Sequence, residues 1–160
     1  MLNERQLKKK ALEEEFADLV GRPWPGRRYP GCYEVIQLYA KRELGRDLKS
    51  FRGLYTSFKD EAVAEENGLW ITKPVWGEPL DFDLIQKNDL LLYKIYTSEL
   101  GGGYSTKMAD RAPNHGAVYL GDGFILHQVW QQPSNIVDLQ NKNAYLYQHS
   151  CVGVVRENTT

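Results

Sequence analysis

The chain has few of the features that would place it in a specialised class of protein. Its 160 residues include only two cysteines, Cys32 and Cys151, too few for a disulfide framework. No apolar run is long enough to cross a membrane, and the basic N-terminal stretch lacks the apolar segment of a secretory leader. A net charge of -1 argues against nucleic-acid binding. We therefore expect synthesis in a reducing cytoplasm, no signal peptide, no membrane insertion and no nucleic-acid partner.

Size and composition fit an ordinary globular protein. With 42% hydrophobic and 26% charged residues, 160 residues suffice for one well-formed core. No repeat, low-complexity stretch or linker divides the chain, so we expect a single domain over residues 1–160.

The first half of the chain reads as helical. Apolar positions at helical spacing predict an amphipathic helix over residues 4–20, ended by Gly21 and a proline-rich loop. A second helix begins near Cys32, runs to about Leu44 and ends at Gly45. Residues 46–84 read as an irregular insertion with a short helix near 60–67.

The second half reads as β structure. Strands are predicted at 89–96, 115–120, 124–128, 135–138 and 151–156, with a glycine-rich loop at 101–114. The Gly-Asp-Gly sequence at 121–123 predicts a hairpin between the second and third of these strands. Helices followed by a meandering antiparallel sheet predict an α+β domain.

Cys32 and two histidines, His115 and His127, form the most informative combination of side chains. Cys32 opens a helix, where the helix dipole favours a thiolate. The histidines frame the hairpin, one near each outer end, and we expect them to fall nearly opposite each other on neighbouring strands. A thiol, a base and a group that orients the base make up a nucleophilic triad.

Other interpretations of the same residues remain open. A lone cysteine is usually a small buried apolar group, and strand histidines often only satisfy local hydrogen bonds. Cys151 lies in an apolar run and is expected to serve core packing alone. A zinc site of Cys32, His115 and His127 is conceivable, but no paired-ligand spacing supports it. We therefore predict no metal and no cofactor.

Five segments together resemble the NlpC family of papain-like cysteine peptidases, which are bacterial cell-wall endopeptidases. They are the Gly-Arg-Pro-Trp loop at 21–24, the helix start at 31–36, the strand at 88–93, the hairpin at 115–127 and the closing strand at 152–156. The hairpin, which ends in a second histidine, is the most specific of them. The match covers roughly residues 20–156, and it is closest to the versions found in the tails of long-tailed phages.

The resemblance implies a papain-like fold whose nucleophile-bearing helix packs on an antiparallel sheet. Cys32 would be the nucleophile, His115 the base and His127 the residue that orients it. The family cleaves peptide bonds of the peptidoglycan stem, commonly between D-glutamate and diaminopimelate. The oxyanion-binding tyrosine of the family is replaced by Trp24 or displaced to Tyr29.

Two further departures flank the thiol. Gly31 stands where the family has aspartate, and Glu34 where it has glycine. Without an export signal, the phage versions imply delivery from the host cytoplasm into the virion tail, among other tail tip proteins. The rival hypotheses are an inactive structural tail component and an injected antibacterial cell-wall toxin.

Overall fold

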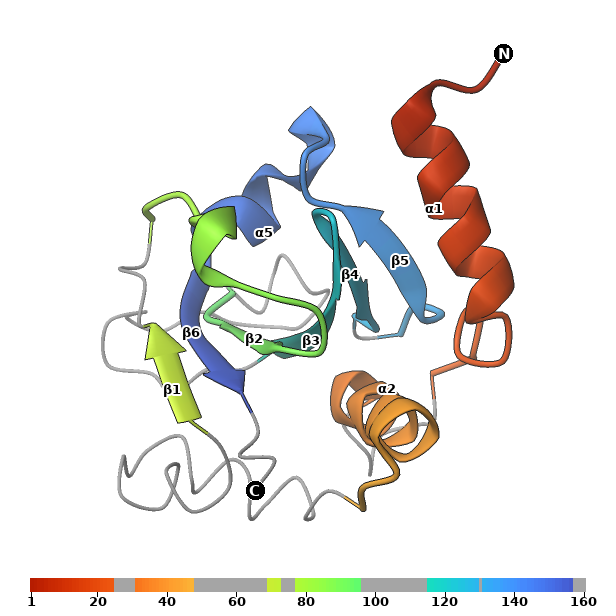
Figure 1. The fold of residues 1–160 in the computed structure, drawn as a ribbon, viewed down its shortest axis with the longest axis horizontal. Helices are drawn as coiled ribbons and strands as arrows, with labels where there is room; N and C mark the ends of the chain where they lie inside the picture. The colour runs from red at the N-terminus through yellow and green to blue at the C-terminus, as the bar shows by residue number, and fades with distance from the viewer. Residues whose placement is uncertain (25–30, 48–68, 73–76, 96–114, 130, 157–160) are drawn as a thin grey trace.

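A computed structural model describes residues 1–24, 31–47, 69–72, 77–95, 115–129 and 131–156, and for residues 31–33, 69–72 and 145 it describes the backbone alone. In these ranges, helices pack on both faces of an antiparallel six-stranded sheet whose strand order is β1-β6-β2-β3-β4-β5 (Figure 1). The α+β class predicted from the sequence is confirmed. The expected helix at 60–67 and loop at 101–114 lie outside the described residues.

The elements follow the predicted order along the chain. The helices are α1 (Glu4–Glu15), α2 (Gly31–Tyr39), which continues as a π-helical turn (Ala40–Leu44), and α5 (Tyr145–His149). The strands are β1 (Leu69–Thr72), β2 (Leu90–Tyr93), β3 (His115–Gly121), β4 (Phe124–His127), β5 (Asn135–Asp138) and β6 (Cys151–Arg156). Short 3₁₀ helices lie at Phe82–Leu84 and Lys142–Ala144. The second helix ends as predicted, with Gly45 in the left-handed conformation at φ 62°.

Helix α1 begins as predicted but ends at Glu15, five residues earlier than expected. At its start, Asn3 and Gln6 form a reciprocal capping box. At its end, the guanidinium of Arg42 donates to the Glu15 carbonyl at 2.6 Å, which satisfies a terminal helix acceptor. The chain then turns and buries Phe16 completely and Leu19 almost completely. The buried apolar residues of the segment predicted as a helix are therefore covered within the chain. They lie in the turn after α1 rather than in the helix itself.

The sheet contains one strand that the sequence analysis did not predict. Strand β1 lies inside the stretch 46–84 that was expected to be irregular, and it pairs antiparallel with β6. Strand β2 is shorter than the predicted 89–96. The remaining strands match their predicted ranges to within a residue.

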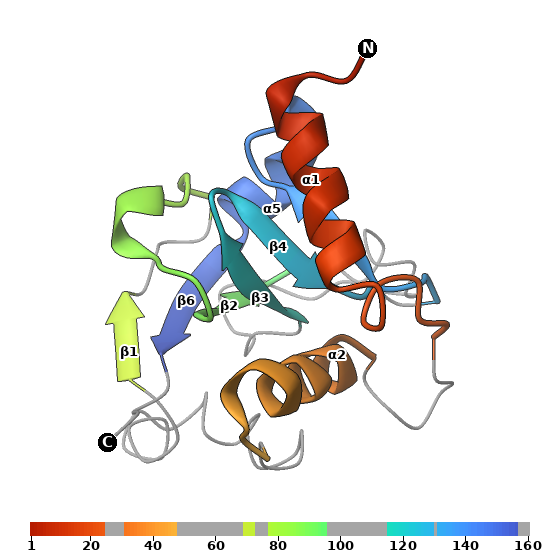
Figure 2. The ribbon, with the colours of Figure 1, turned by 45° about the vertical axis from the view of Figure 1, so that its right-hand side comes forward.

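The two faces of the sheet have separate apolar cores. One core joins the turn after α1 and the α2 face of Val35, Ile36 and Tyr39 to the sheet. The other lies under α5 and includes Leu91, Tyr93, Ala117 and Cys151. Figure 1 shows α2 and α5 on opposite sides of the central strands, and Figures 1 and 2 both show α1 alongside β5.

Candidate active site

Helix α2 carries Cys32 as its second residue, in the first turn. Backbone N–H groups at a helix start are unpaired within the helix and favour a negative charge. Ile36, one turn later, is buried against the sheet, as the sequence pattern predicts. The helix start that the prediction assigns to Cys32 is therefore confirmed. The Cys32 side chain lies outside the description, so its distance to His115 stays a prediction.

The start of β3 lies close against α2. A Cβ atom added to Gly116 would sit 3.1 Å from the Cδ1 atom of Ile36, which is tighter than about nine in ten real contacts of this kind. Glycine at this position therefore allows the helix to approach the strand. Gly116 follows His115 directly, and Ile36 lies one turn from Cys32, so the helix start and the first residue of β3 belong to the same end of the fold.

The two histidines form a hydrogen-bonded pair. Nε2 of His115 lies 3.0 Å from Nδ1 of His127, and the rings meet edge to face with their centroids 5.2 Å apart. Both side chains are buried, at 5% and 1% exposure. The prediction that His127 approaches a ring nitrogen of His115 is confirmed.

A bulge in the hairpin sets this pairing. Asp122 and Gly123 both have positive φ values, 53° and 85°, as a two-residue hairpin turn of this kind requires. The register then shifts between Tyr119 and Gly121, so that Tyr119 pairs with Ile125. Continued along the strands, this register puts His127 opposite Ala117. The histidines are therefore diagonal neighbours on one face, two residues from direct opposition, whereas nearly direct opposition was expected. Without the bulge, the register at the turn would put His127 opposite Val118, one residue further from His115.

Aromatic rings from β2 and α5 enclose the histidine pair. The Tyr93 ring lies 5.8 Å from the His115 ring, and the Tyr147 ring lies 4.8 Å from the His127 ring, measured between centroids. Since successive strand residues face opposite sides, the histidines share the α5 face, whereas Gly116 faces α2. A thiol on the first turn of α2 therefore has to meet His115 around the end of the sheet, at the first residue of β3.

Burial keeps the histidine pair uncharged. It lowers the pKa of His127 to about 4, although the neighbouring Asn135 side chain works in the opposite direction. Burial, and to a smaller degree the nearby His127, lowers the pKa of His115 well below its usual value. At neutral pH each ring therefore carries one proton, and His115 has a lone pair with which to accept another.

The loop before α2 is fastened to the β4–β5 connection. The Arg22 N–H donates to the buried Ser134 hydroxyl at 2.9 Å, and the Gln128 amide donates to the Arg22 carbonyl at 3.0 Å. These bonds fix the backbone just before Trp24, which is half-buried. The oxyanion roles predicted for Trp24 and Tyr29 remain predictions, and Tyr29 lies outside the described residues.

Glu34, the unexpected acid two residues after Cys32, is ion-paired. Its carboxylate accepts from the Arg22 guanidinium at 3.1 Å. An unpaired carboxylate here would oppose a thiolate, whereas this cation offsets its charge. The departure from the family pattern at position 34 is thus electrostatically compensated.

Cys151 lacks the accessible, readily ionised thiol that a nucleophile needs. It is 1% exposed within the α5-side core, and burial raises the pKa of its thiol to about 12. Such a thiol is protonated and inert at neutral pH. The predicted core-packing role of Cys151 is confirmed.

Two residues of the family-like motifs have a role that the sequence analysis missed. Asp89 is fully buried just before β2, and Arg156 at the end of β6 binds it through two bonds of 2.8 Å. The Gln86 N–H donates to the same carboxylate at 2.9 Å. This fork ties two neighbouring strands together, and only the register of β2 on β6 brings the partners into reach.

Within the described ranges, no group of three or more histidine, cysteine or acidic side chains is arranged to hold a metal ion. The zinc alternative includes Cys32, whose side chain is outside those ranges, and so it stays open. Among the described helices, none is long and apolar enough to cross a membrane.

The fold is similar to that of a Staphylococcus aureus protein described as similar to a lipoprotein of the NLP/P60 family. The match has a TM-score of 0.51 and covers 99% of this chain and 43% of that protein, at 18% sequence identity. An NlpC/P60 family protein from Bacillus cereus matches with a TM-score of 0.32 over 51% of this chain and 22% of its own, at 22% identity. No protein-family model and no curated protein matches the chain.

At this level of identity, the Staphylococcus aureus comparison establishes the fold. The chain has a papain-like α+β fold of the kind found in NlpC/P60 proteins, a family of cell-wall peptidases, as the sequence predicts. The chain spans less than half of the Staphylococcus aureus protein.

Proposed function

We propose that the chain is a cysteine peptidase that hydrolyses peptide bonds in the peptidoglycan stem. The observation that carries this proposal is the buried hydrogen bond of 3.0 Å between His115 and His127. We place Cys32 beside this pair because Gly116, which follows His115, approaches Ile36, one helical turn after Cys32. A base oriented by a second side chain, beside a helix start that bears a thiol, is the arrangement that nucleophilic catalysis needs.

The proposed reaction has two halves. His115 takes the proton of Cys32, and the thiolate attacks the scissile carbonyl carbon to form a tetrahedral intermediate. The Cys32 backbone N–H, with Trp24, holds the oxyanion; such a donor typically contributes about 3 kcal/mol. The C–N bond then breaks as His115 returns the proton to the leaving amine. Water, deprotonated by His115, cleaves the resulting thioester and restores the thiol.

The finer assignment rests on the motif resemblance. It favours the bond between D-glutamate and diaminopimelate as substrate, and a place among the tail tip proteins of a long-tailed phage, with synthesis in the host cytoplasm. Peptidoglycan stem peptide and tail tip proteins are the partners of this proposal. Cell-wall penetration during infection would then be the step that the peptidase serves.

A structural tail component without activity is the alternative that Glu34 suggested. A carboxylate so close to Cys32 would disfavour a thiolate, but the ion pair between Glu34 and Arg22 offsets this negative charge and so weakens the argument for an inactive protein. An injected cell-wall toxin would use the same chemistry.

Purified sacculi and defined muropeptides test the proposal. The wild-type protein should release cleaved stem peptides, Cys32→Ala should release none, and both should have the same circular dichroism spectrum. Cys151→Ala is the matched control and should keep activity, with only a small loss of stability from its cavity. A wild-type protein without hydrolysis would favour the structural alternative, and exchanged phenotypes of the two variants would overturn the choice of nucleophile.

A further inference from the structure

Gln128, the residue directly after the strand that ends in His127, is buried and binds the loop that precedes α2. Its amide nitrogen donates to the carbonyl oxygen of Arg22 at 3.0 Å and to that of Gln132 at 2.9 Å. Both partners can only accept, so the nitrogen end of the amide has to face them. The side chain that follows the histidine pair along the strand therefore holds the segment that leads to α2.

The backbone of Arg22 is engaged on both of its polar groups. Its N–H donates to the Ser134 hydroxyl at 2.9 Å, and its carbonyl accepts the Ser134 N–H at 3.0 Å as well as the Gln128 amide. The Ser134 hydroxyl in turn donates to the Leu19 carbonyl at 2.7 Å. The bonds of Ser134 attach this segment to the connection before β5, and the bond from Gln128 further fixes its direction.

The side chain of Arg22 extends this link to the helix that carries Cys32. Its guanidinium is ion-paired at 3.1 Å with Glu34, in the first turn of α2. The apolar face of α2 holds the helix on the sheet, but apolar contacts are not directional, whereas hydrogen bonds are. A partly exposed ion pair adds little to global stability, so its loss should be felt at α2 rather than throughout the fold.

We propose that Gln128 is a positioning residue, which holds Arg22 in place and, through the ion pair of Arg22 with Glu34, sets the first turn of α2 relative to the buried histidine pair. The residue after His127 is thus connected by two contacts to the second residue after Cys32. The catalytic consequence, a thiol kept in reach of its base, rests on the proposed peptidase function. The placement of α2 does not depend on that function.

Amide hydrogen exchange of the full chain tests the placement without an assay of activity. Gln128→Met keeps the length of the side chain and removes both N–H donors, while Ser134 still holds the segment. Relative to β2 and β3, exchange over residues 35–39 of α2 should become about fivefold faster, as the loss of one hydrogen bond predicts. Tyr119→Phe, which loses the bond to the Gly123 N–H at the other end of the hairpin, is the control and should accelerate α2 no more than the sheet.

The exchange pattern separates a positioning role from a merely stabilising one. Equal acceleration of α2 and the sheet in Gln128→Met, or none in α2, would overturn the proposal.

A double-mutant cycle tests the route through Arg22. Arg22→Met combined with Glu34→Gln removes the ion pair, keeps the backbone carbonyl at position 22 and leaves no unpaired charge. This background should show the same faster exchange in α2, and the addition of Gln128→Met should accelerate α2 no further. Additive effects would overturn the proposal. Should Gln128→Met fail to fold, the background alone remains a test, and unchanged exchange in its α2 would overturn the proposal.

Kinetics connect the placement to the proposed reaction. In an active peptidase, Gln128→Met should lower kcat about fivefold and leave KM unchanged, because the thiol and its base are misplaced while substrate binding is not altered. An unchanged kcat would overturn the catalytic consequence. The predicted exchange in a protein that hydrolyses nothing would count against the proposed function alone, whereas unchanged exchange in an active enzyme would count against the positioning role alone.

Discussion

The two ends of the β3–β4 hairpin carry polar side chains in opposite states. At the turn, Asp122 is half-exposed and forms ion pairs with Arg5 at 3.2 Å and with Lys8 at 2.9 Å. At the open end, His115 and His127 are buried and uncharged. The ion pairs at the turn are exposed to solvent, so each contributes little to stability. The buried histidine pair depends instead on which ring nitrogens carry protons and on the direction of the hydrogen bond between the rings.

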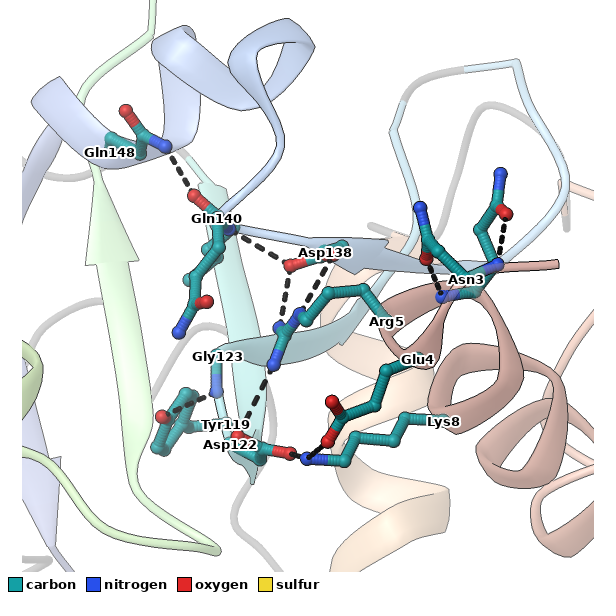
Figure 3. Close-up of polar contacts among 12 residues, drawn as sticks. Asn3, Glu4, Arg5, Lys8, Tyr119, Asp122, Gly123, Asp138, Gln140 and Gln148 are labelled. Carbon is teal, nitrogen blue, oxygen red and sulfur yellow. Dashed lines mark hydrogen bonds and ion pairs between the residues drawn. The ribbon is translucent and has the colours of Figure 1, made fainter.

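Figure 3 shows how the turn end holds α1. Arg5 reaches from α1 to both carboxylate oxygens of Asp138 on β5, at 2.7 and 3.1 Å, and also to Asp122. Its guanidinium lies 4.2 Å from the centre of the Phe124 ring. The helix is thus fastened by charge at its start and by apolar burial just beyond its end.

Deleting residues 1–20 should have the largest effect on stability. It removes Arg5 together with the buried Phe16 and Leu19, and each such apolar side chain contributes about 1.5–3 kcal/mol. We expect a loss of several kcal/mol and a melting temperature lower by roughly ten degrees. Leu7→Ala, an exposed position on the same helix, should melt like the wild type. A truncated protein with an unchanged melting temperature would instead favour α1 as a docking element for a partner.

Acid should weaken the open end before the turn end. The pKa of His127 is lowered to about 4, so unfolding takes up a proton between about pH 6.5 and pH 4. Stability is therefore complete above about pH 6.5 and falls by about 3 kcal/mol on the way to pH 4. Burial acts to raise the pKa of Asp138, but its bonds to Arg5 and the Gln140 N–H outweigh this and lower it, and ion pairs lower the pKa of Asp122. The contribution of both carboxylates is lost only at more acidic pH. Urea titrations at several pH values would contradict this if stability were constant from pH 7 to pH 4.5 in the wild type.

Arg5→Ala should cost about 1 kcal/mol, since the ion pair with Asp138 is half-buried but open to solvent. The loss should shrink in high salt because ions screen exposed charges. Lys8→Ala is the control, and its more exposed ion pairs predict no measurable change. Chemical denaturation at low and high ionic strength measures the free energy of unfolding of both variants. An equal loss in the two would contradict the expectation that the more buried ion pair contributes more to stability.

The smallest effect compares two tyrosines, one at each end. The Tyr93 hydroxyl is buried and has no hydrogen-bond partner among the described residues, so Tyr93→Phe should leave stability equal or raise it by up to about 1 kcal/mol. The Tyr119 hydroxyl accepts the Gly123 N–H of the turn at 2.8 Å, so Tyr119→Phe should lower stability by about 1 kcal/mol. Melting curves of the pair that showed the same sign would contradict the comparison.

Local signals explain what the sequence predicted. The Gly-Asp-Gly turn needs positive φ at its centre, which few residues allow, so its location was readable without a structure. The start of the Cys32 helix and its end at Gly45 rest on equally local preferences. The candidate pair of histidines followed from their positions near the outer ends of the predicted hairpin, which bring them together on neighbouring strands.

Features that depend on distant segments were not predictable. Strand β1 exists through its pairing with β6, and the five residues of α5 are too few for a helical pattern. The bulge after Tyr119 shifts the pairing of β3 with β4 by one residue, and no residue in the sequence marks its position. Asn135 becomes a neighbour of His127 only through the β4–β5 register. These are effects of tertiary pairing, which one-dimensional patterns do not contain.

Alkylation of the two cysteines tests the central claim most directly. The full chain is treated with iodoacetamide at pH 6, and mass spectrometry of its peptides follows Cys32 and Cys151 separately. The account predicts fast labelling of Cys32 that slows strongly in His115→Ala, and almost none of Cys151, the pKa of whose thiol is raised to about 12. Equally slow labelling of both thiols in the folded wild-type protein would contradict it.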